Sequence, residues 1–334
     1  MNKKYSPVTP AVLSRRSFVV SALAAAAAPA SSALAADYPT QNVRVVIPYP
    51  AGGPTDIAGR LMTNVLEKAT GRAFFVDNKA GASGTIGAED VSRATPDGHT
   101  LLVNASAHVI YPAIMKSLRF DVISDFRPVT QLVSVPILLL LHPSLPVTNV
   151  KELIAHIKAN PGKLSFASSS RGGATHLAGE LFKQLNQLDM VHVPYRGAAP
   201  ALTDLMAGHV QIMFDSMLSA SGNVQSGALK ALAVSTPQRS ALLPNLPTMV
   251  EAGIPGFAFT NWYGLWAPKN TPQPVLDKLI AELNKGYKSA EITEKLRAIG
   301  AEPVISPPDE FAKFCESEKD FWAKVATAAG LEKE

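Results

Sequence analysis

The sequence has little of what several common functional classes need. It contains a single cysteine, Cys315, among 334 residues, so no internal disulfide can form. Its seven histidines show neither an HExxH motif nor another paired metal-ligand spacing. A GxxxxGKS/T phosphate loop, a GxGxxG dinucleotide fingerprint and a GxSxG serine elbow are also missing. We therefore expect neither a metal nor a cofactor, and the commonest nucleotide-binding and serine-hydrolase motifs are excluded.

An excess of charge is missing from most of the chain. The formal net charge of +4 arises within the first 36 residues, which carry Lys3, Lys4, Arg15 and Arg16 and no acidic residue. The remainder has 27 basic and 27 acidic residues, without polybasic runs. Such a balance gives no electrostatic footprint for nucleic acid or for an anionic membrane surface.

The N-terminal segment predicts export. Paired arginines in "SRRSFVV" (residues 14–20) precede a short, alanine-rich apolar run that ends in the small-x-small triplet Ala33-Leu34-Ala35. These are the parts of a bacterial signal peptide, and the twin arginines favour the twin-arginine route to the periplasm. The alternative is an uncleaved anchor, although the run is short for a membrane span, and no later segment offers about 20 uninterrupted apolar residues. We expect a signal peptide over residues 1–36.

The rest of the chain alternates between strand and helix patterns. "NVRVVIPY" (residues 42–49) predicts a strand, and Ile57, Leu61, Val65 and Ala69 mark the apolar stripe of the helix that follows. "LVSVPILLLLHP" (residues 132–143) is interpreted as one apolar strand that carries a proline. The C-terminal segment is helical, with an aromatic stripe in which Cys315 is expected to be a buried structural thiol. This rhythm favours an α/β fold with parallel neighbouring strands.

One motif occurs twice. "AGGPTDIAGRL" (residues 51–61) and "RGGATHLAGEL" (residues 171–181) share G-G-x-T-x-I/L-A-G-x-L, and each follows a predicted strand. A helix start offers unpaired N–H groups and a partial positive charge, and glycine lets a ligand approach the backbone. Two similar lobes would therefore form an anion clamp across a cleft. The alternative is an ordinary strand-to-helix turn in each copy, with Thr55 and Asp56 capping the first.

Other polar residues near predicted strand ends are weaker candidates. Asp215 ends an apolar strand, where it either receives an ammonium or hydroxyl group of a ligand or caps the next turn. Arg171 and Arg196 either pair with a carboxylate or lie on the surface. His176 either reaches a ligand or is a solvated residue of the helix's first turn, and Ser106 adds a hydroxyl at another strand end.

Several blocks in the same order resemble the receptors of tripartite tricarboxylate transporters, often called Bug proteins. They include "VVIPYPAGGPTDIAGRL", "NKAGASGTIGAEDVSRATPDGHTLL", "SFASSSRGGATHLAGELF" and "VPYRGAAPALTDLMAGHVQIMFDS". The likeness covers almost the whole chain after the signal. It implies a two-domain periplasmic binding protein fold of type II-like architecture, with the ligand cleft between the domains. It implies a discontinuous domain 1 (residues 37–137 and 264–334) and a domain 2 (residues 138–263).

The resemblance also implies how a ligand is held. The two Gly-Gly loops would act as pincers on a carboxylate, often through bridging waters. The family's positions carry over to Tyr49, Ala51, Gly53, Thr55, Ser106, Ser170, Thr175 and Asp215. The repeat itself adds Gly52, Arg171 and Gly172, and the serine run that precedes its second copy adds Ser169. Arg171 departs from the family, which commonly has a small or polar residue there, and it indicates a second acidic group on the ligand.

The expected function is therefore that of an exported, monomeric, non-enzymatic receptor. It would capture a small carboxylate (a dicarboxylate, tricarboxylate, acidic amino acid or aromatic acid) by closure of two domains, and hand it to inner-membrane transporter subunits. Two alternatives stay open. One is a sensor that presents its ligand to a membrane signalling protein, and the other is an enzyme that uses Asp215 and His176 as an acid–base pair.

Overall fold

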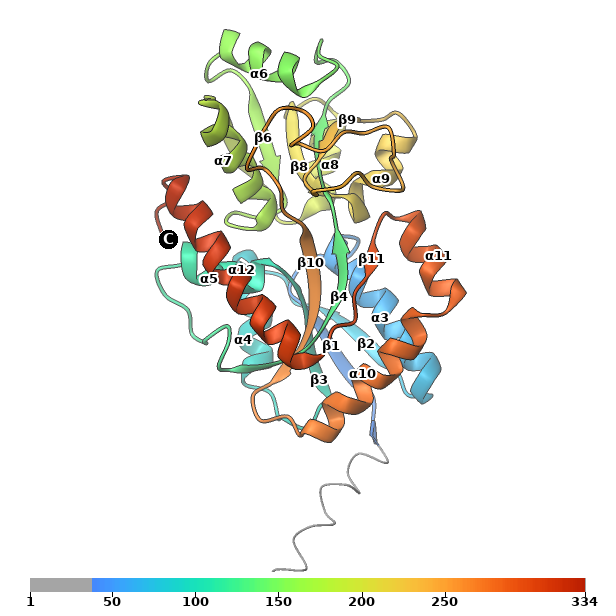
Figure 1. Cartoon of the computed structure of the whole chain (residues 1–334). Coiled ribbons are helices and arrows are strands. Elements are labelled where there is room, and N and C mark those ends of the chain that lie inside the picture. Colours follow the sequence, from blue (N-terminus) through green and yellow to red (C-terminus); the bar gives the residue numbers. More distant parts are fainter. Residues whose placement is uncertain (1–37, 334) are drawn as a thin grey trace, which may run out of the picture.

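Residues 38–333, which the computed structural model describes, form two β-sheets flanked by helices (Figure 1). The predicted signal peptide lies outside these described residues. The first sheet has the strand order β11-β4-β10-β3-β1-β2. Its strands are β1 (Val43–Ile47), β2 (Phe74–Asn78), β3 (Thr100–Ala105), β4 (Phe126–Val135), β10 (Asn261–Pro268) and β11 (Glu302–Pro303).

The second sheet has the order β7-β6-β8-β5-β9. Its strands are β5 (Ile137–Leu141), β6 (Ser165–Ser168), β7 (Val191–Pro194), β8 (Ile212–Ser216) and β9 (Lys230–Val234). β1 pairs in parallel with β2 and β3, and β6 pairs in parallel with β7 and β8, as the strand–helix rhythm predicted. β10 and β5 are antiparallel to their neighbours, so both sheets are mixed.

We call each sheet with its helices a lobe. The first lobe has α3 and α10 on one side of its sheet and α4, α5 and α12 on the other (Figure 1). Its helices are α3 (Pro54–Thr70), η1 (Ala82–Gly84), α4 (Thr85–Ser92), α5 (Ala107–Ile114), α10 (Gln273–Tyr287), α11 (Ala290–Ala298) and α12 (Pro308–Ala328). The second lobe has α6 (Val150–Ala159), α7 (Ala174–Asn186), α8 (Ala198–Met206) and α9 (Met217–Gln225). In the described part of the chain, every helix is too short or too polar to cross a membrane.

The predicted apolar stripe of α3 is confirmed at Val65 and wrong elsewhere, and Ala69 is exposed. Ile57 and Leu61 are only half-buried, whereas Ala58 and Gly59 face the sheet and are buried. A side chain at Gly59 would place its Cβ 2.5 Å from Cδ1 of Ile47 on β1. The small Ala-Gly pair therefore lets the helix backbone approach the strand closely, and this contact decides which face of α3 is buried.

The segment at residues 132–143 is two strands instead of the single strand predicted. β4 ends before Pro136, and β5 begins after it in the other sheet. Proline has no N–H to continue a strand ladder, so the chain leaves the first sheet at this residue. The chain crosses to the second sheet at Pro136 and returns to the first sheet just before β10. Ser235 links the two crossings, because its hydroxyl oxygen accepts the Ile137 N–H (3.0 Å) and its O–H donates to the Phe259 carbonyl (2.9 Å).

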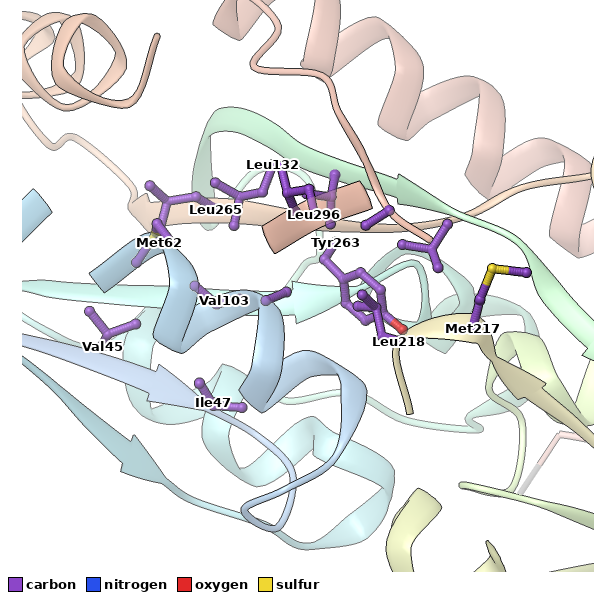
Figure 2. Packing of buried hydrophobic residues seen from close by; sticks show 14 of the residues in the cluster. Val45, Ile47, Met62, Val103, Leu132, Met217, Leu218, Tyr263, Leu265 and Leu296 are labelled. Carbon is purple, nitrogen blue, oxygen red and sulfur yellow. The ribbon is translucent and has the colours of Figure 1, made fainter. Parts of the chain in front are cut away.

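The apolar core continues from one lobe into the other. One buried cluster combines first-lobe strands with Met217 and Leu218, which open α9 of the second lobe. Figure 2 shows the ring of Tyr263 pointing from β10 toward Leu218. The two lobes therefore share a hydrophobic core at their junction, and Tyr263 belongs both to this core and to the lining of a polar pocket.

The last helix, α12, packs along the first lobe and reaches the second. Cys315 is 1% exposed within an aromatic cluster of the first lobe, as predicted for a structural thiol. Further along, Trp322 packs against Phe259 of the second lobe's core, with ring centroids 5.2 Å apart. Glu318, the one polar residue in this stripe, accepts the indole N–H of Trp262 (2.7 Å) and of Trp322 (3.0 Å). The stripe is therefore core packing.

Candidate functional site

The two copies of the repeated motif have the same backbone conformation. Gly52 and Gly172 have φ values of 80° and 73°, a left-handed region that side-chain-bearing residues rarely adopt. Gly53 (φ −78°, ψ 168°) and Gly173 (φ −78°, ψ 171°) then lead into α3 and α7. Each copy follows the carboxyl end of a strand, β1 or β6, as predicted. The repeated sequence therefore encodes a repeated loop.

The two loops meet at one small pocket, which we call the inner pocket. It encloses about 40 Å³ between the lobes. Its walls come from loops and helix starts of both sheets: Tyr49, Pro50, Gly53, Pro54, Thr55, Ala105, Ser106, Ala107, Ser169, Ser170, Gly173, Ala174, Thr175, Gly197, Ala198, Ser216, Asn261 and Tyr263. Among the described residues, none that lines this pocket carries a charged side chain. An ion bound here would depend on neutral donors.

Within residues 38–333, five helices begin at the inner pocket. The N-cap residues of α3, α5, α7, α8 and α9 are Gly53, Ser106, Gly173, Gly197 and Ser216, and all five line it. None of these five helix starts has a side-chain cap hydrogen bond. Each one leaves N–H groups without an intrahelical partner and carries a partial positive charge. Their convergence makes the pocket an anion site.

Two helices that begin elsewhere, α6 and α11, have a side-chain cap, whereas α4, α10 and α12 have none. The side chain of Asn149 accepts the Glu152 N–H at the start of α6 (2.9 Å), and Ser289 accepts the Ile292 N–H at the start of α11 (3.4 Å). Neither helix start lines the inner pocket. What distinguishes the inner pocket is therefore the convergence of five uncapped helix starts, and the lack of a cap alone does not set these helices apart.

Neutral hydroxyl and amide groups complete the inner pocket. The Ser106 hydroxyl donates to Oδ1 of Asn261 (2.9 Å), whose Nδ2 donates to the Tyr263 hydroxyl oxygen (2.9 Å). Burial raises the pKa of Tyr263, so this phenol stays protonated. Ser169 and Thr175 contact each other through their hydroxyl oxygens at 3.0 Å. The polar groups are uncharged, and the helix ends supply the positive potential.

A second, wider pocket adjoins the first, and we call it the outer pocket. It has a volume of about 590 Å³ and shares Tyr49, Pro50, Ser169, Ser170 and Gly197 with the inner pocket. Its other walls include Arg171 and Arg196 of the second lobe and residues 80–84 of the first. Burial raises the pKa of Tyr49, which stands at the boundary of the two pockets and stays protonated. Among the described residues that line the two pockets, those with positively charged side chains therefore belong to the outer pocket alone.

The predicted caps of α3 have another role. The N-cap is Gly53, and the Asp56 carboxylate instead accepts the Gly52 N–H (2.9 Å) and the Arg60 Nε–H (2.8 Å) through Oδ2. Its Oδ1 accepts the amide of Asn78 on β2 at 3.0 Å. Burial opposes ionisation of Asp56, but the hydrogen bonds from Arg60, Gly52 and Asn78 lower its pKa overall. Asp56 is therefore a charged residue directed away from the pocket.

His176 is not the solvated residue of the predicted alternative, and its reach to a ligand stays a prediction. It is 4% exposed and lines neither the inner nor the outer pocket. Its Nδ1 accepts the Gly172 N–H at 3.0 Å, and its Nε2 lies 3.7 Å from Glu180. Asp215 accepts the hydroxyl of Ser219 (2.6 Å). The two members of the suggested acid–base pair are thus hydrogen-bonded to other groups.

The predicted ligand-binding residues divide by location. The inner pocket contains Tyr49, Gly53, Thr55, Ser106, Ser169, Ser170 and Thr175, and the outer pocket adds Arg171. Ala51, Gly52, Gly172 and Asp215 line neither pocket. Asp215 is fully buried, and its Oδ1 has no partner among the described residues. Direct contact of any of these residues with a ligand stays a prediction.

Sequence reasoning missed several wall residues. Gly197 and Ala198 follow the short strand β7, and they form a third Gly-containing helix start whose signal was visible in "YRGAAPALTDL". Ser216 follows Asp215, which was singled out in its place. Asn261 was detectable as a polar residue that opens an otherwise apolar strand.

The chain is similar to known proteins along most of its described length. Residues 58–331 match the model of the Tripartite tricarboxylate transporter family receptor. Protein BugT of Bordetella pertussis is 34% identical over 311 residues, which are 92% of this chain and 94% of that protein. The solved structure of R. palustris Rpa4515 with adipate has a TM-score of 0.87 and 35% identity, and covers 89% of this chain and 100% of its own. The periplasmic binding protein BugD has a TM-score of 0.85 and 35% identity, with the same coverage.

These matches bear directly on the predicted fold. The α/β architecture with two sheets and a site between them agrees with the solved structures of such binding proteins, so the predicted periplasmic binding protein fold is confirmed. The resemblance drawn from the motifs is confirmed as well, because the family match covers most of the chain. The chain belongs to the family of tripartite tricarboxylate transporter receptors.

Proposed function

We propose that this protein is a periplasmic receptor that captures a small dicarboxylate between its two lobes and delivers it to the membrane subunits of a tripartite tricarboxylate transporter. The observation that carries the proposal is the convergence of uncapped helix starts from both lobes on the inner pocket. One carboxylate there would accept N–H groups from both lobes at once, directly or through water.

The dimensions of the two pockets favour a ligand with two acidic ends. The inner pocket, at about 40 Å³, accommodates little more than one carboxylate or a few water molecules. The outer pocket provides room for the rest of the molecule and presents the guanidinium groups of Arg171 and Arg196. Guanidinium binds carboxylate through paired, charge-assisted hydrogen bonds. The family member solved with adipate, a dicarboxylate, supports the same class of ligand.

Capture follows from closure of the lobes. A ligand that contacts both lobes only when they are close together stabilises the closed state by its differential affinity. The crossing at Pro136 and the return crossing between Phe259 and β10, which Ser235 joins by hydrogen bonds, are the connections about which the lobes would move. In this proposal the moving bodies are domain 1 (residues 37–137 and 264–334) and domain 2 (residues 138–263), the protein is monomeric, and the segment at residues 1–36 directs its export through the twin-arginine route.

A ligand series measured by calorimetry tests the proposal. We expect adipate or a shorter dicarboxylate to bind with micromolar affinity, and saturation at 100 times Kd to stabilise the fold by about 2.7 kcal/mol. The corresponding monocarboxylates should bind more weakly, and 1,6-hexanediol should show no binding. A series of mono-, di- and tricarboxylates and acidic amino acids without any binding would refute the receptor function.

A variant of Arg171 tests the dicarboxylate class separately. Arg171→Gln should weaken dicarboxylate binding by about tenfold or more, because a charged hydrogen bond contributes about 1.5–3 kcal/mol. It should leave the affinity for a monocarboxylate nearly unchanged. Arg239→Gln is the matched control, since Arg239 pairs with Glu251 (2.8 Å) and lines neither pocket. Equal losses for mono- and dicarboxylates would refute the assignment of the outer pocket.

A further inference from the structure

The fifth residue of the repeated motif, counted from its first glycine, makes the same hydrogen bond in both copies. Asp56 Oδ2 accepts the N–H of Gly52 at 2.9 Å, and His176 Nδ1 accepts the N–H of Gly172 at 3.0 Å. The two side chains are 3% and 4% exposed. Carboxylate and imidazole are chemically unlike, yet the same acceptor position is filled behind both loops.

A charged residue follows each acceptor at the same spacing, with a hydrogen bond in the first copy and a longer contact in the second. Arg60, four residues after Asp56, donates its Nε–H to Oδ2 of Asp56 at 2.8 Å. Glu180, four residues after His176, has Oε1 3.7 Å from Nε2 of His176. The charges are reversed between the copies, with an acid supported by a base in α3 and an imidazole supported by an acid in α7.

A stacked ring holds His176 in a second direction. The imidazole of His192, on β7, lies parallel to that of His176 with centroids 3.8 Å apart and an interplanar angle of 16°. Nε2 of His192 is in turn 2.7 Å from the Ser168 hydroxyl oxygen, and the Phe166 ring stacks with the His192 ring at a centroid distance of 4.8 Å. His176 therefore presents Nδ1 to the loop in a fixed orientation.

The hydrogen bond matters because of the residue that receives it. Gly52 and Gly172 are the left-handed residues of the two loops, and their conformation sets the direction in which the next residues enter α3 and α7. The N–H of each glycine donates to a side chain that does not line the inner pocket. This hydrogen bond fixes the glycine so that the uncapped helix start after it faces the inner pocket. A loop free to rotate here would lose the alignment of those N–H groups.

We propose that Asp56 and His176 are equivalent positioning residues, each of which fixes one Gly-Gly loop by accepting its first N–H group. They act through the backbone and do not contact the ligand. To fix the loop, the side chain at position 176 must present a hydrogen-bond acceptor where Nδ1 of His176 lies. The effect on affinity rests on the proposed function, whereas the effect on the loop itself does not.

Two substitutions of similar polarity separate positioning from general packing. In His176→Asn, Oδ1 takes the place of Nδ1 and keeps the acceptor, whereas in His176→Gln the acceptor moves out to the place of Nε2. We expect the Gln variant to lower the hydrogen-exchange protection of the Gly172 amide about five- to tenfold and that of Gly52 not at all. Dicarboxylate affinity should fall by a similar factor, and Asn should restore both quantities. Asp56→Ala should have the reciprocal effect, on Gly52 alone.

Nuclear magnetic resonance of the free, full-length mature protein measures the exchange rates without any ligand. Equal effects of Asn and Gln at position 176, or an unchanged Gly172 amide in the Gln variant, would overturn the proposal. If exchange responds as expected but no carboxylate binds to the wild-type protein, the positioning role stands and the receptor function fails. If either His176 variant does not fold, Asp56→Asn and Asp56→Ala make the same comparison at the first loop.

Discussion

Alanine at position 172 should weaken dicarboxylate binding by about 5- to 100-fold relative to alanine at position 52. Both glycines are in the left-handed region, so both substitutions carry a similar backbone cost of about 1 kcal/mol. Only Gly172 faces the other lobe, where its Cβ would lie 1.9 Å from Cδ1, 3.1 Å from Cγ1 and 3.3 Å from Cβ of Ile114 on α5. A Cβ at Gly52 meets nothing within 4 Å.

The difference between the two variants isolates closure of the lobes. Rotation of the Ile114 terminal methyl group relieves the 1.9 Å contact but leaves Cγ1 and Cβ at 3.1 and 3.3 Å, closer than ordinary van der Waals contact, and overpacking of this kind costs about 1–3 kcal/mol. In the proposed closure, opening of the lobes would remove this contact, so the cost would fall on the closed, ligand-bound state, and about 1.4 kcal/mol corresponds to tenfold in affinity. Calorimetry on both variants measures the effect, and Ile114→Val, which removes Cδ1, should recover part of it. Equal affinities of the two alanine variants would contradict closure at this contact.

Replacing Asp215 by asparagine should stabilise the protein at pH 8 and have little effect at pH 4.5. Burial raises the pKa of Asp215 from 3.8 to about 7, although the hydrogen bond from Ser219 opposes the shift. The folded state therefore keeps a proton between about pH 4 and 7 that the unfolded chain has lost. The stabilisation from this bound proton is fully present below the pKa that Asp215 has in the unfolded chain. It is lost as the pH rises through the pKa that Asp215 has in the folded protein.

The asparagine variant has no proton to lose at this position. We expect it to exceed the wild-type protein by about 1–3 kcal/mol in the free energy of unfolding at pH 8, with the difference growing from pH 5 upward. Urea denaturation of both proteins at several pH values measures it. Asp189→Asn, the same substitution at an exposed carboxylate, is the control for the chemical change itself. A constant difference at every pH, or a loss of stability at pH 8, would contradict the buried, proton-binding state of Asp215.

The local features of the site were predictable from sequence because their causes are local. A helix start after a strand is determined within a few residues, so the starts of α3 and α7 after the two Gly-Gly pairs were predicted correctly. The apolar face of α3 was misplaced because the contact of Gly59 with Ile47 decides it, and that contact is tertiary. Pro136 signalled a break in the strand, but the strand's division between two sheets depends on pairings far along the chain.

The inner pocket as a whole was less predictable. Two of its helix starts come from the repeat, while those of α5, α8 and α9 have unrelated sequences and meet the others only through the fold. His176 was visible as a polar residue of a first helical turn. Its role as an acceptor for the Gly172 N–H depends on rings and strands outside its own segment. The chemistry of the site was thus indicated by sequence, whereas the set of donors required the structure.

Amide chemical shifts on addition of a dicarboxylate test the central claim most directly. If the anion is held by converging helix starts, the first-turn amides of α3, α5, α7, α8 and α9, such as those of Thr55, Ala107 and Ala174, should move downfield. The first-turn amides of α6 and α11, which Asn149 and Ser289 already cap, are internal controls and should not move. Binding that leaves the pocket amides unshifted, or that shifts both groups equally, would contradict the account.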